Sequence, residues 1–510
     1  MANYKIFRCA ILIAAALALL GTFCFFYHQE QSMCMGVKIL SEKEYSILQY
    51  GAPENVDSLI FQDSVPVAMD TESATIYVSQ DIDETTYLAE LSGILNITNG
   101  GYSLVFAPDD SFSDLFSAMG EGHRFKLLVT KKGVCCKEYQ VIFTNLPVLR
   151  LSGTGDIFTE SGASGMVVVW TPMDPDTGKY SVKTSDAQWH IRGGSSQGLA
   201  KKSLKLNIRD ESGNKRNMTL CGMGEDDDWI LNAMAADDLK IREATVGSVW
   251  QKIQETSVNP QKMSYGMYVE VISNDNYQGI YLLQRRIDEK YLELKSNHIL
   301  CKGWTYAPPE DSIFEVKHCI YSTDLQQKLA IEYYEHSDPQ HIQLDNWIDV
   351  NILVQACCLP DNAGLKNMYY LWTIHQENYT LSLIPWDTDM AFGYGWDNST
   401  GVTYEPDEYP SGCRINRSEY LALQNIYTNL ETMIADRWTQ LRDSGLSAEY
   451  VLASVEIHKN QLIDSGAYNR DIECWGIRNN NADTFEKLYV YIDERFMALD
   501  SYYEYSPCCE

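Results

Sequence analysis

Basic residues are scarce in this chain, and the usual metal and redox motifs are absent. Lys and Arg number 40 against 70 Asp and Glu, which gives a formal net charge of −30. A surface this acidic repels nucleic-acid phosphates, so nucleic acid is excluded as a main partner. The 14 cysteines contain no C-x-x-C pair, which argues against zinc ribbons and thioredoxin-type redox centres. The 9 histidines contain no H-x-H or H-E-x-x-H motif and are better explained as surface or core residues.

Long hydrophobic runs are also rare, and the chain has one near its start. An uncharged apolar stretch over residues 10–27 follows Lys5 and Arg8. Its length is at the lower limit for a membrane-spanning helix, and the preceding charges predict that residues 1–9 are cytoplasmic. A cleaved signal peptide is the alternative, although residues 21–24 make a poor cleavage site. We therefore expect a single-pass membrane protein whose bulk is extracytoplasmic.

The remaining sequence divides into a stalk and two folded units. Residues 28–65 are polar and mixed, as expected of a stalk. Residues 66–147 alternate apolar and polar over short runs, which predicts a small all-β sandwich that acts as a spacer. Residues 148–505 are first strand-rich, with one helix over 237–253, and then helical except for a hairpin over 366–389. This order predicts an α+β domain with two lobes and a cleft between them.

A loop rich in Gly and Ser, RGGSSQG at 192–198, precedes a cationic strand-like segment. Such a loop can bring backbone N–H groups close to phosphate oxygens. Alternation with period two places Lys202 on the same face as Leu204 and Leu206, toward the interior. A lysine in that position requires a negative partner, either protein or ligand. The alternative is a plain hairpin with a cationic surface.

The same loop also matches G-x-S-x-G at 194–198, the nucleophile elbow of α/β-hydrolases, with Ser196 as the nucleophile. That motif requires a helix directly after the serine. The segment that follows here alternates like a strand, so the hydrolase interpretation is disfavoured.

Acidic side chains gather around the predicted hairpin. Asp361 and Asn367 precede its first strand, and Asp387 and Asp389 follow its second strand. Protein kinases place a catalytic Asp and a metal-binding Asn on one loop, and a metal-binding Asp one hairpin later. Carboxylate and amide oxygens are the hard ligands that Mg²⁺ prefers. Here no His-Arg precedes Asp361, and a structural Ca²⁺ site or a glycosidase acid pair are alternatives for the second acidic segment.

Taken together, these segments resemble the spore-coat protein H (CotH) kinase family, an atypical kinase-like family. The resemblance covers roughly residues 146–505. The segments that carry it, in matching order and spacing, are 192–206, 227–244, 268–288, 361–372 and 384–393.

The resemblance implies a divergent kinase fold that uses ATP and Mg²⁺ to phosphorylate Ser or Thr of surface or spore-coat proteins. Asp361 is then the expected catalytic base, and Lys202 the expected phosphate-binding lysine. The metal ligands implied by position are Asn367, Asp387 and Asp389.

Further phosphate contacts are implied for the Gly-rich loop, where Arg192, Ser195 and Ser196 lie. Arg242 lies on the helix between the strands, where the family tends to keep an Arg. A nucleotide-binding role and an ordinary ion pair are both open for that residue.

One position departs from the family. Gln284 stands where a Glu often follows the strand motif, and a neutral amide cannot pair with Lys or Mg²⁺ as a carboxylate does. Glu270 or Glu289 are the acids nearby in sequence. Two functions therefore remain: an active kinase, or a catalytically weak kinase-like surface protein for binding or coat assembly.

Overall fold

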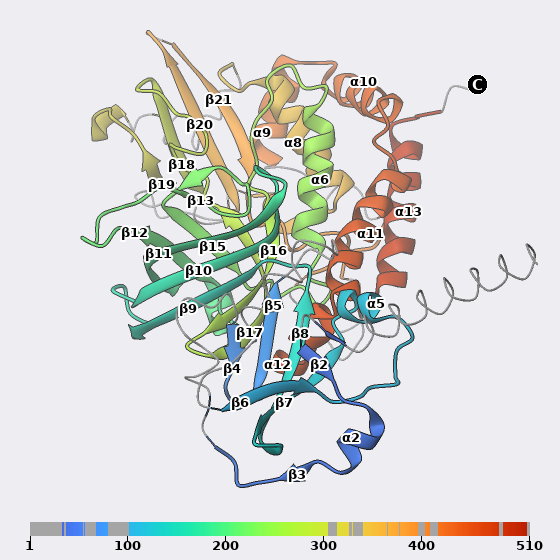
Figure 1. Ribbon diagram of the computed structural model, residues 1–510. Coiled ribbons are helices and arrows are strands. Elements are labelled where there is room, and N and C mark those ends of the chain that lie inside the picture. The colour runs from blue at the N-terminus through green and yellow to red at the C-terminus, as the bar shows by residue number, and fades with distance from the viewer. Residues whose placement is uncertain are drawn as a thin grey trace, which may run out of the picture.

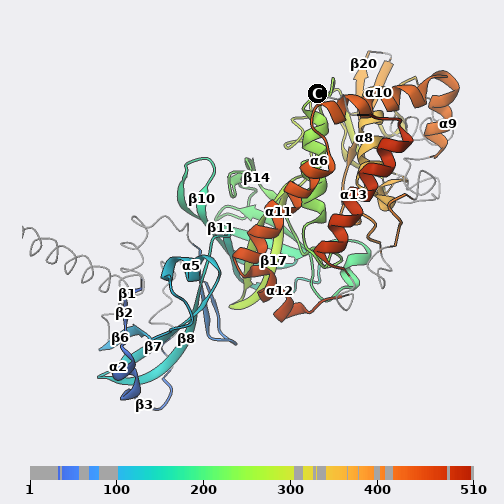
Figure 2. The same ribbon diagram turned by 90° about the vertical axis from the view of Figure 1, so that its right-hand side faces the viewer.

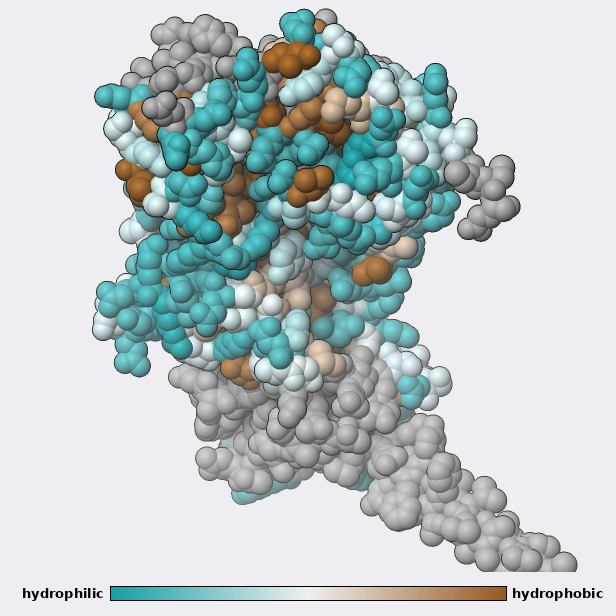
Figure 3. All heavy atoms as spheres, turned by 90° about the horizontal axis from the view of Figure 1, so that it is seen from above, coloured by the Kyte–Doolittle hydropathy of each residue, from teal (hydrophilic) through white to brown (hydrophobic). Residues whose placement is uncertain are grey.

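The computed structural model describes residues 33–34, 37–54, 56, 68–79, 101–303, 314–325, 329, 340–395, 403–407, 417–478 and 483–506, apart from 365 and 377. Along the chain an N-terminal sheet is followed by a closed β-barrel and then by a second sheet covered by helices (Figure 1). The N-terminal sheet lies at one end of the molecule, next to the barrel, and most of the helices lie at the other (Figure 2). On the face drawn in Figure 3, hydrophilic residues predominate and hydrophobic ones lie scattered among them, as expected of a chain this acidic.

The N-terminal sheet has eight strands in a mixed arrangement, in the order β1-β2-β6-β7-β8-β5-β4, with β3 also paired to β8. Strand β8 runs parallel to β3 and β5 but antiparallel to β7. The strands are β1 Met33–Cys34, β2 Val37–Ile39, β3 Gln49–Tyr50, β4 Ala68–Asp70, β5 Thr75–Ser79, β6 Tyr102–Phe106, β7 Arg124–Lys131 and β8 Val134–Thr144. Two short helices accompany them, α2 Glu42–Ser46 and α5 Leu115–Gly120.

The predicted all-β sandwich is therefore wrong. One face of this single sheet holds its own hydrophobic core, but the other face packs on the barrel instead of on a second sheet. Tyr77 of β5 stacks on Tyr277 of the barrel with ring centroids 4.7 Å apart. Alternation along a strand shows that a face is buried, but it does not show what covers that face.

The barrel closes through seven strands in the order β10-β11-β12-β15-β17-β16-β9. Strands β9 and β16 are parallel neighbours, and the other pairings are antiparallel. The barrel strands are β9 Val148–Gly155, β10 Ala163–Asp174, β11 Lys179–Ile191, β12 Leu204–Arg209, β15 Asp228–Asn232, β16 Gly266–Ser273 and β17 Asn276–Arg285, and a small pair, β13 Met218–Thr219 and β14 Glu225–Asp226, lies beside them. Large side chains such as Trp189, Trp229 and Tyr281 belong to its buried core. The strand-rich prediction for this region is confirmed.

Helix α6 Arg242–Gln254 is inserted between barrel strands β15 and β16, close to the predicted 237–253. It begins five residues later than expected. Residues 237–241 form a turn in which Asp237 accepts a hydrogen bond of 2.9 Å from the backbone N–H of Arg242. Asp237 thus satisfies one of the free N–H groups of the first helical turn.

The C-terminal sheet has four antiparallel strands in the order β19-β18-β20-β21. They are β18 His298–Gly303, β19 Phe314–His318, β20 Met368–His375 and β21 Asn378–Pro385, so the predicted hairpin is confirmed. The helices are α8 Leu344–Ala356, α9 Arg417–Ile426, α10 Leu430–Asp443, α11 Ala448–Asp464, α12 Ala467–Trp475 and α13 Phe485–Tyr502. Strand β21 is held by Asn346 of α8, whose side chain makes hydrogen bonds of 2.7 and 3.1 Å with the backbone N–H and C=O of Leu383.

The fold class and the localisation predicted from the sequence both need correction. The structure is a mixed α/β arrangement of several sheets and helices, not an α+β domain preceded by an all-β sandwich. The predicted span at 10–27 lies outside the described residues. Among the residues that are described, no helix is both long and apolar enough to cross a membrane, so the expected single-pass anchor is not supported.

Candidate active site

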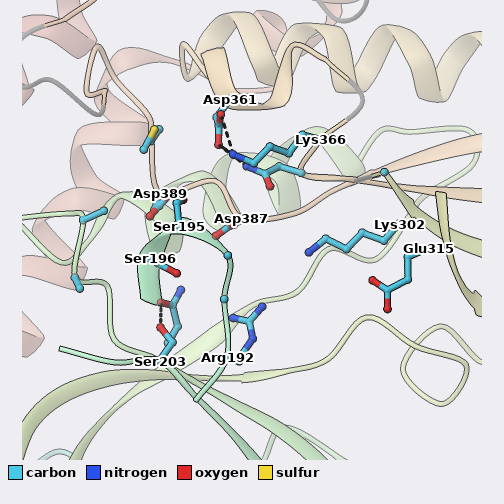
Figure 4. Close-up of a pocket in the computed structure, with 18 of the residues that line it drawn as sticks. Arg192, Ser195, Ser196, Ser203, Lys302, Glu315, Asp361, Lys366, Asp387 and Asp389 are labelled. Carbon is cyan, nitrogen blue, oxygen red and sulfur yellow. Dashed lines mark hydrogen bonds and ion pairs between the residues drawn. The ribbon is translucent and has the colours of Figure 1, made fainter. Parts of the chain in front are cut away.

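A pocket of about 360 Å³ lies between the barrel and the C-terminal sheet. Figure 4 shows the acidic side chains Asp361, Asp387 and Asp389 on one side of it and Arg192 and Lys302 on the other. The pocket brings together most of the residues predicted for the site: Arg192, Ser195, Ser196, Asp361, Asn367, Asp387 and Asp389.

The loop that carries Asp361 is fixed by hydrogen bonds to the end of β21. Asp361 lies in a short 3₁₀ turn, where Asn367 donates to its carboxylate at 2.7 Å and the Lys366 ammonium lies 3.0 Å away. The buried Asn362 amide donates to the backbone carbonyls of Asn367 and Trp386, each at 2.8 Å. These hydrogen bonds hold the two acidic segments next to each other, although more than twenty residues separate Asp361 from Asp387 in the sequence.

Asn367 and Asp387 adopt the same uncommon backbone conformation. Both have φ of 58°, in the left-handed region. Asn and Asp tolerate this region better than most side chains, but it still persists only where the surrounding structure imposes it. A hydrogen bond of 3.0 Å from the N–H of Trp386 to the carbonyl of Asn367 joins the two sites at the base of the hairpin.

The charged form of Asp389 is destabilised by its surroundings. Burial, followed by the nearby carboxylates of Asp387, Glu243, Asp237 and Asp361, raises its pKa well above the usual range. Among the described residues, no donor or cation is paired with the side chain of Asp387 or Asp389 by a hydrogen bond or ion pair. A carboxyl group whose pKa is raised by neighbouring carboxylates is suited to a bound cation.

The residues present fit Mg²⁺ as part of a metal–phosphate complex. Within the described part of the chain, no group of three or more His, Cys, Asp or Glu is arranged to hold a metal by itself. Mg²⁺ usually takes one or two protein carboxylates and completes its shell with water and substrate phosphates. The pair Asp387 and Asp389 meets that requirement.

The barrel side of the pocket is a tight turn after β11. Gly193 has φ of 115°, a backbone conformation that favours glycine, and a Cβ there would lie 2.3 Å from the Ser196 hydroxyl. The Gln197 side chain donates to the Gly193 carbonyl at 2.7 Å and closes the turn. Arg192 and the two serines, Ser195 and Ser196, face the pocket from this turn.

A comparison with protein families shows which family contains this pocket. The family model described as CotH kinase protein matches residues 189–350 and 339–499, more than half of the chain, and includes the whole lining of the pocket. The chain belongs to the CotH kinase protein family. This confirms the resemblance seen in the sequence. No curated protein matches the chain at a significant level.

Lys202, the expected phosphate lysine of this CotH-family chain, lies outside the described lining of the pocket. Its ammonium donates to the carbonyls of Gln197, at 2.7 Å, and Leu199, and these hydrogen bonds stabilise the Gly-rich turn. Strand β12 begins only at Leu204, and the alternation assumed from the sequence therefore does not extend back to Lys202. The neighbouring Lys201 is the buried lysine.

Lys201 joins the barrel to one C-terminal helix, α12. Its ammonium pairs with the Asp471 carboxylate of α12 and donates to the carbonyl of Ile280. Burial lowers the pKa of Lys201 to about 8, against the opposing effect of Asp471. The C-terminal helix α12 is thus joined to the segment that follows the Gly-rich turn.

Arg242 is also bound away from the pocket. Its guanidinium makes two bonds of 2.8 Å to Asp483 and one of 2.5 Å to Asp237, and it donates to the carbonyl of Ala391 at 3.1 Å. It also lies over the ring of Tyr394, 4.2 Å from the centroid. Of the two interpretations left open for Arg242, this geometry supports an ion pair, although a buried one.

The sequence interpretation missed Glu243, which lies beside Gln284. The Gln284 amide donates to one Glu243 carboxylate oxygen at 2.8 Å, and Asn232 donates to the other at 2.5 Å. Burial, then the charge of Asp387, raises the pKa of Glu243 to about 7. Glu270, considered as a substitute for the missing family Glu, is instead bound by Arg470. The sequence did contain a signal that could have pointed to Glu243, because this residue lies within segment 227–244, one of those that carry the family resemblance.

Lys302 of β18 was missed as well, and no motif in its strand would have found it. It lines the pocket, and burial lowers its pKa to about 8 against the opposing charge of Asp387. The ammonium lies 5.8 Å from the centroid of the Trp386 ring.

Proposed function

We propose that this protein transfers a phosphoryl group from ATP, with Mg²⁺, to Ser or Thr hydroxyls of a protein substrate. The observation that carries the proposal is the pocket itself, in which Asp387 and Asp389 lie opposite Arg192 and Lys302 without forming ion pairs among the described residues. A metal–nucleotide complex has matching charge, because its metal suits the acids and its phosphates suit the cations.

The chain supplies the parts that phosphoryl transfer requires. Asp361 would accept the proton of the attacking hydroxyl, and its contacts with Lys366 and Asn367 fix the carboxylate orientation. Asp387, Asp389 and Asn367 would hold Mg²⁺, which supplies neutralisation of phosphate charge when bound. Arg192 and the turn with Ser195 and Ser196 would contact phosphate oxygens.

The protein substrate follows from family membership at the level of class. A kinase family implies a protein hydroxyl acceptor, and we place that acceptor among surface or spore-coat proteins. The strongly acidic chain, with a formal net charge of −30, favours a neutral or basic acceptor over an acidic one.

Thermal unfolding of the protein with ATP, with Mg²⁺ and with both tests the proposal. We expect a rise in melting temperature that requires both ligands and is lost in Asp387→Ala, since ligand at about 100 times its Kd adds about 2.7 kcal/mol. Labelled phosphate should then pass from ATP to an unstructured serine-rich protein. A shift that is unchanged in Asp387→Ala, or the absence of any shift, would contradict the proposal.

A catalytically weak binding protein is the second candidate, and Gln284 favours it. This residue gives Glu243 an amide partner, where a family Glu would add a second carboxylate. If that carboxylate serves catalysis in the family, this chain would bind the metal–nucleotide complex but turn over slowly. Restoring the acid with Gln284→Glu separates the two candidates, because turnover would rise only in the second.

A further inference from the structure

Arg192, in the turn after barrel strand β11, and Lys302, in strand β18 of the C-terminal sheet, lie over the same aromatic ring. The Arg192 guanidinium is 5.6 Å and the Lys302 ammonium 5.8 Å from the centroid of Trp386. Trp386 is buried and directly precedes Asp387, so one residue contacts both cations and adjoins an expected metal ligand. Cation–π contacts of this kind stabilise a charge without neutralising it.

The positive charge of these two side chains is left uncompensated by the protein. Among the described residues, neither Arg192 nor Lys302 forms an ion pair, whereas the other cations of the pocket lining, Lys201, Lys317 and Lys366, each do. Figure 4 shows the Lys302 side chain extending toward Asp387 with Arg192 nearby, and no dashed line joins them. Partly buried cations without an anionic partner are unfavourable, so an anionic ligand would stabilise this arrangement.

We propose that Lys302 and Arg192, held on Trp386, form a clamp for the terminal phosphates of the nucleotide. Lys302 thereby takes the role that the sequence suggested for Lys202, whose ammonium is bound to the carbonyls behind the loop. The clamp rests on the proposed function, and it adds a binding residue from strand β18, which lies outside the segments that carry the family resemblance. The position of the clamp beside Asp387 places phosphates next to the expected metal ligands.

Binding of two probes by the wild type and by Lys302→Gln tests the clamp. The probes are ATP and inorganic tripolyphosphate, each with Mg²⁺, titrated calorimetrically. We expect both to bind the variant about tenfold to a hundredfold more weakly, because a hydrogen bond between charged groups is lost. Lys295→Gln removes the same charge from an exposed site just before β18 and should leave both affinities unchanged.

The outcomes distinguish the clamp from the proposed function. Equal affinity of the wild type and Lys302→Gln for both probes overturns the clamp alone. Binding of tripolyphosphate that depends on Lys302, without any phosphoryl transfer from ATP, supports the clamp and contradicts the kinase activity. A wild type that binds neither probe overturns both.

A second variant guards against misfolding. If Lys302→Gln shows no cooperative unfolding transition, Lys302→Met replaces it, since methionine keeps an unbranched apolar stem on the Trp386 ring and lacks the charge. The same loss of affinity is expected, and unchanged affinity of the folded Met variant overturns the clamp.

Discussion

The two clusters of charge in this protein differ in whether the protein itself neutralises them. Around Arg242, the carboxylates of Asp237 and Asp483 surround a fully buried guanidinium, and a carbonyl and an aromatic ring complete its contacts. In the pocket, Asp387 and Asp389 lie opposite Arg192 and Lys302, and the described residues form no ion pairs among these four.

This difference separates a structural role from a binding role. We call the cluster of Arg242, Asp237 and Asp483 closed, because its charges are paired with one another. It joins α6 to the segment before α13, and its removal should lower the stability of the fold. We call the cluster of Asp387, Asp389, Arg192 and Lys302 open, because its charges form no ion pairs among the described residues. A ligand of matching charge would be stabilised there, so removal of these charges should weaken ligand binding and lower the rate of the reaction. The part of the pocket proposed to bind metal and phosphate is therefore marked by charges that the described residues leave without ion pairs.

The largest effect is expected from Asp361→Asn, a variant of the proposed general base in the same pocket as the open cluster. Loss of a general base should lower the rate of phosphoryl transfer by about 10²- to 10⁴-fold. The amide keeps an oxygen for the hydrogen bond from Asn367, so stability and ATP affinity should stay close to those of the wild type. Rates from labelled ATP, together with a thermal melt, provide the measurement, and a variant of full activity would remove Asp361 from the mechanism.

The closed cluster is tested by Arg242→Met. Two buried carboxylates lose their cation, and breaking such a pair costs about 3–5 kcal/mol. Urea unfolding of the variant should show this loss in the free energy of unfolding. The double variant with Asp483→Asn should recover part of it, because one uncompensated charge is removed. An unchanged unfolding free energy in Arg242→Met would contradict the structural role.

Glu243 lies between the two clusters, and its effect should depend on pH. Its pKa is about 7 in the folded protein against 4.5 in a model peptide, so the unfolded chain releases its proton first. The stabilising contribution is complete below about pH 4.5 and is lost as pH rises through 7, by about 3 kcal/mol at most.

Glu243→Gln removes this pH dependence. Gln284 has a buried side-chain oxygen without a donor among the described residues, and a turned amide could accept from the side-chain amide introduced at position 243. Free energies of unfolding at pH 5, 6, 7 and 8 should decline in the wild type relative to the variant. Parallel profiles would show that Glu243 does not titrate in this range.

Asp389→Asn should produce the smallest change in stability, and in the opposite direction. Burial and the surrounding carboxylates raise the pKa of Asp389, so ionisation of this group destabilises the folded state as pH rises above the unfolded pKa. Removing its charge should raise stability at pH 8 by about 0.5–2 kcal/mol, as at other sites where function costs stability. The same variant should bind Mg²⁺ with ATP more weakly, and a loss of stability would contradict this account.

Several features of the protein were determined by the sequence alone. Short strand-like runs located most of the barrel strands and the β20–β21 hairpin, because apolar, β-branched and aromatic residues bounded by turn residues are typical of buried strands. The spacing of Asp361, Asn367 and the acids after the hairpin indicated a kinase-like site, and the family followed from the order of the segments. Each of these signals is local, because it is read within one short segment of the chain.

Only the tertiary structure showed which residues from distant parts of the chain contact one another. It paired Arg242 with Asp483 and Lys201 with Asp471, over separations of 241 and 270 residues. It turned Lys202 away from the pocket and brought Lys302 into it from another sheet. It also placed the N-terminal sheet against the barrel, where a sandwich was expected. The physical reason is the same in each case: burial and ion pairing depend on which surfaces meet, and periodicity along one segment carries no information about its partner.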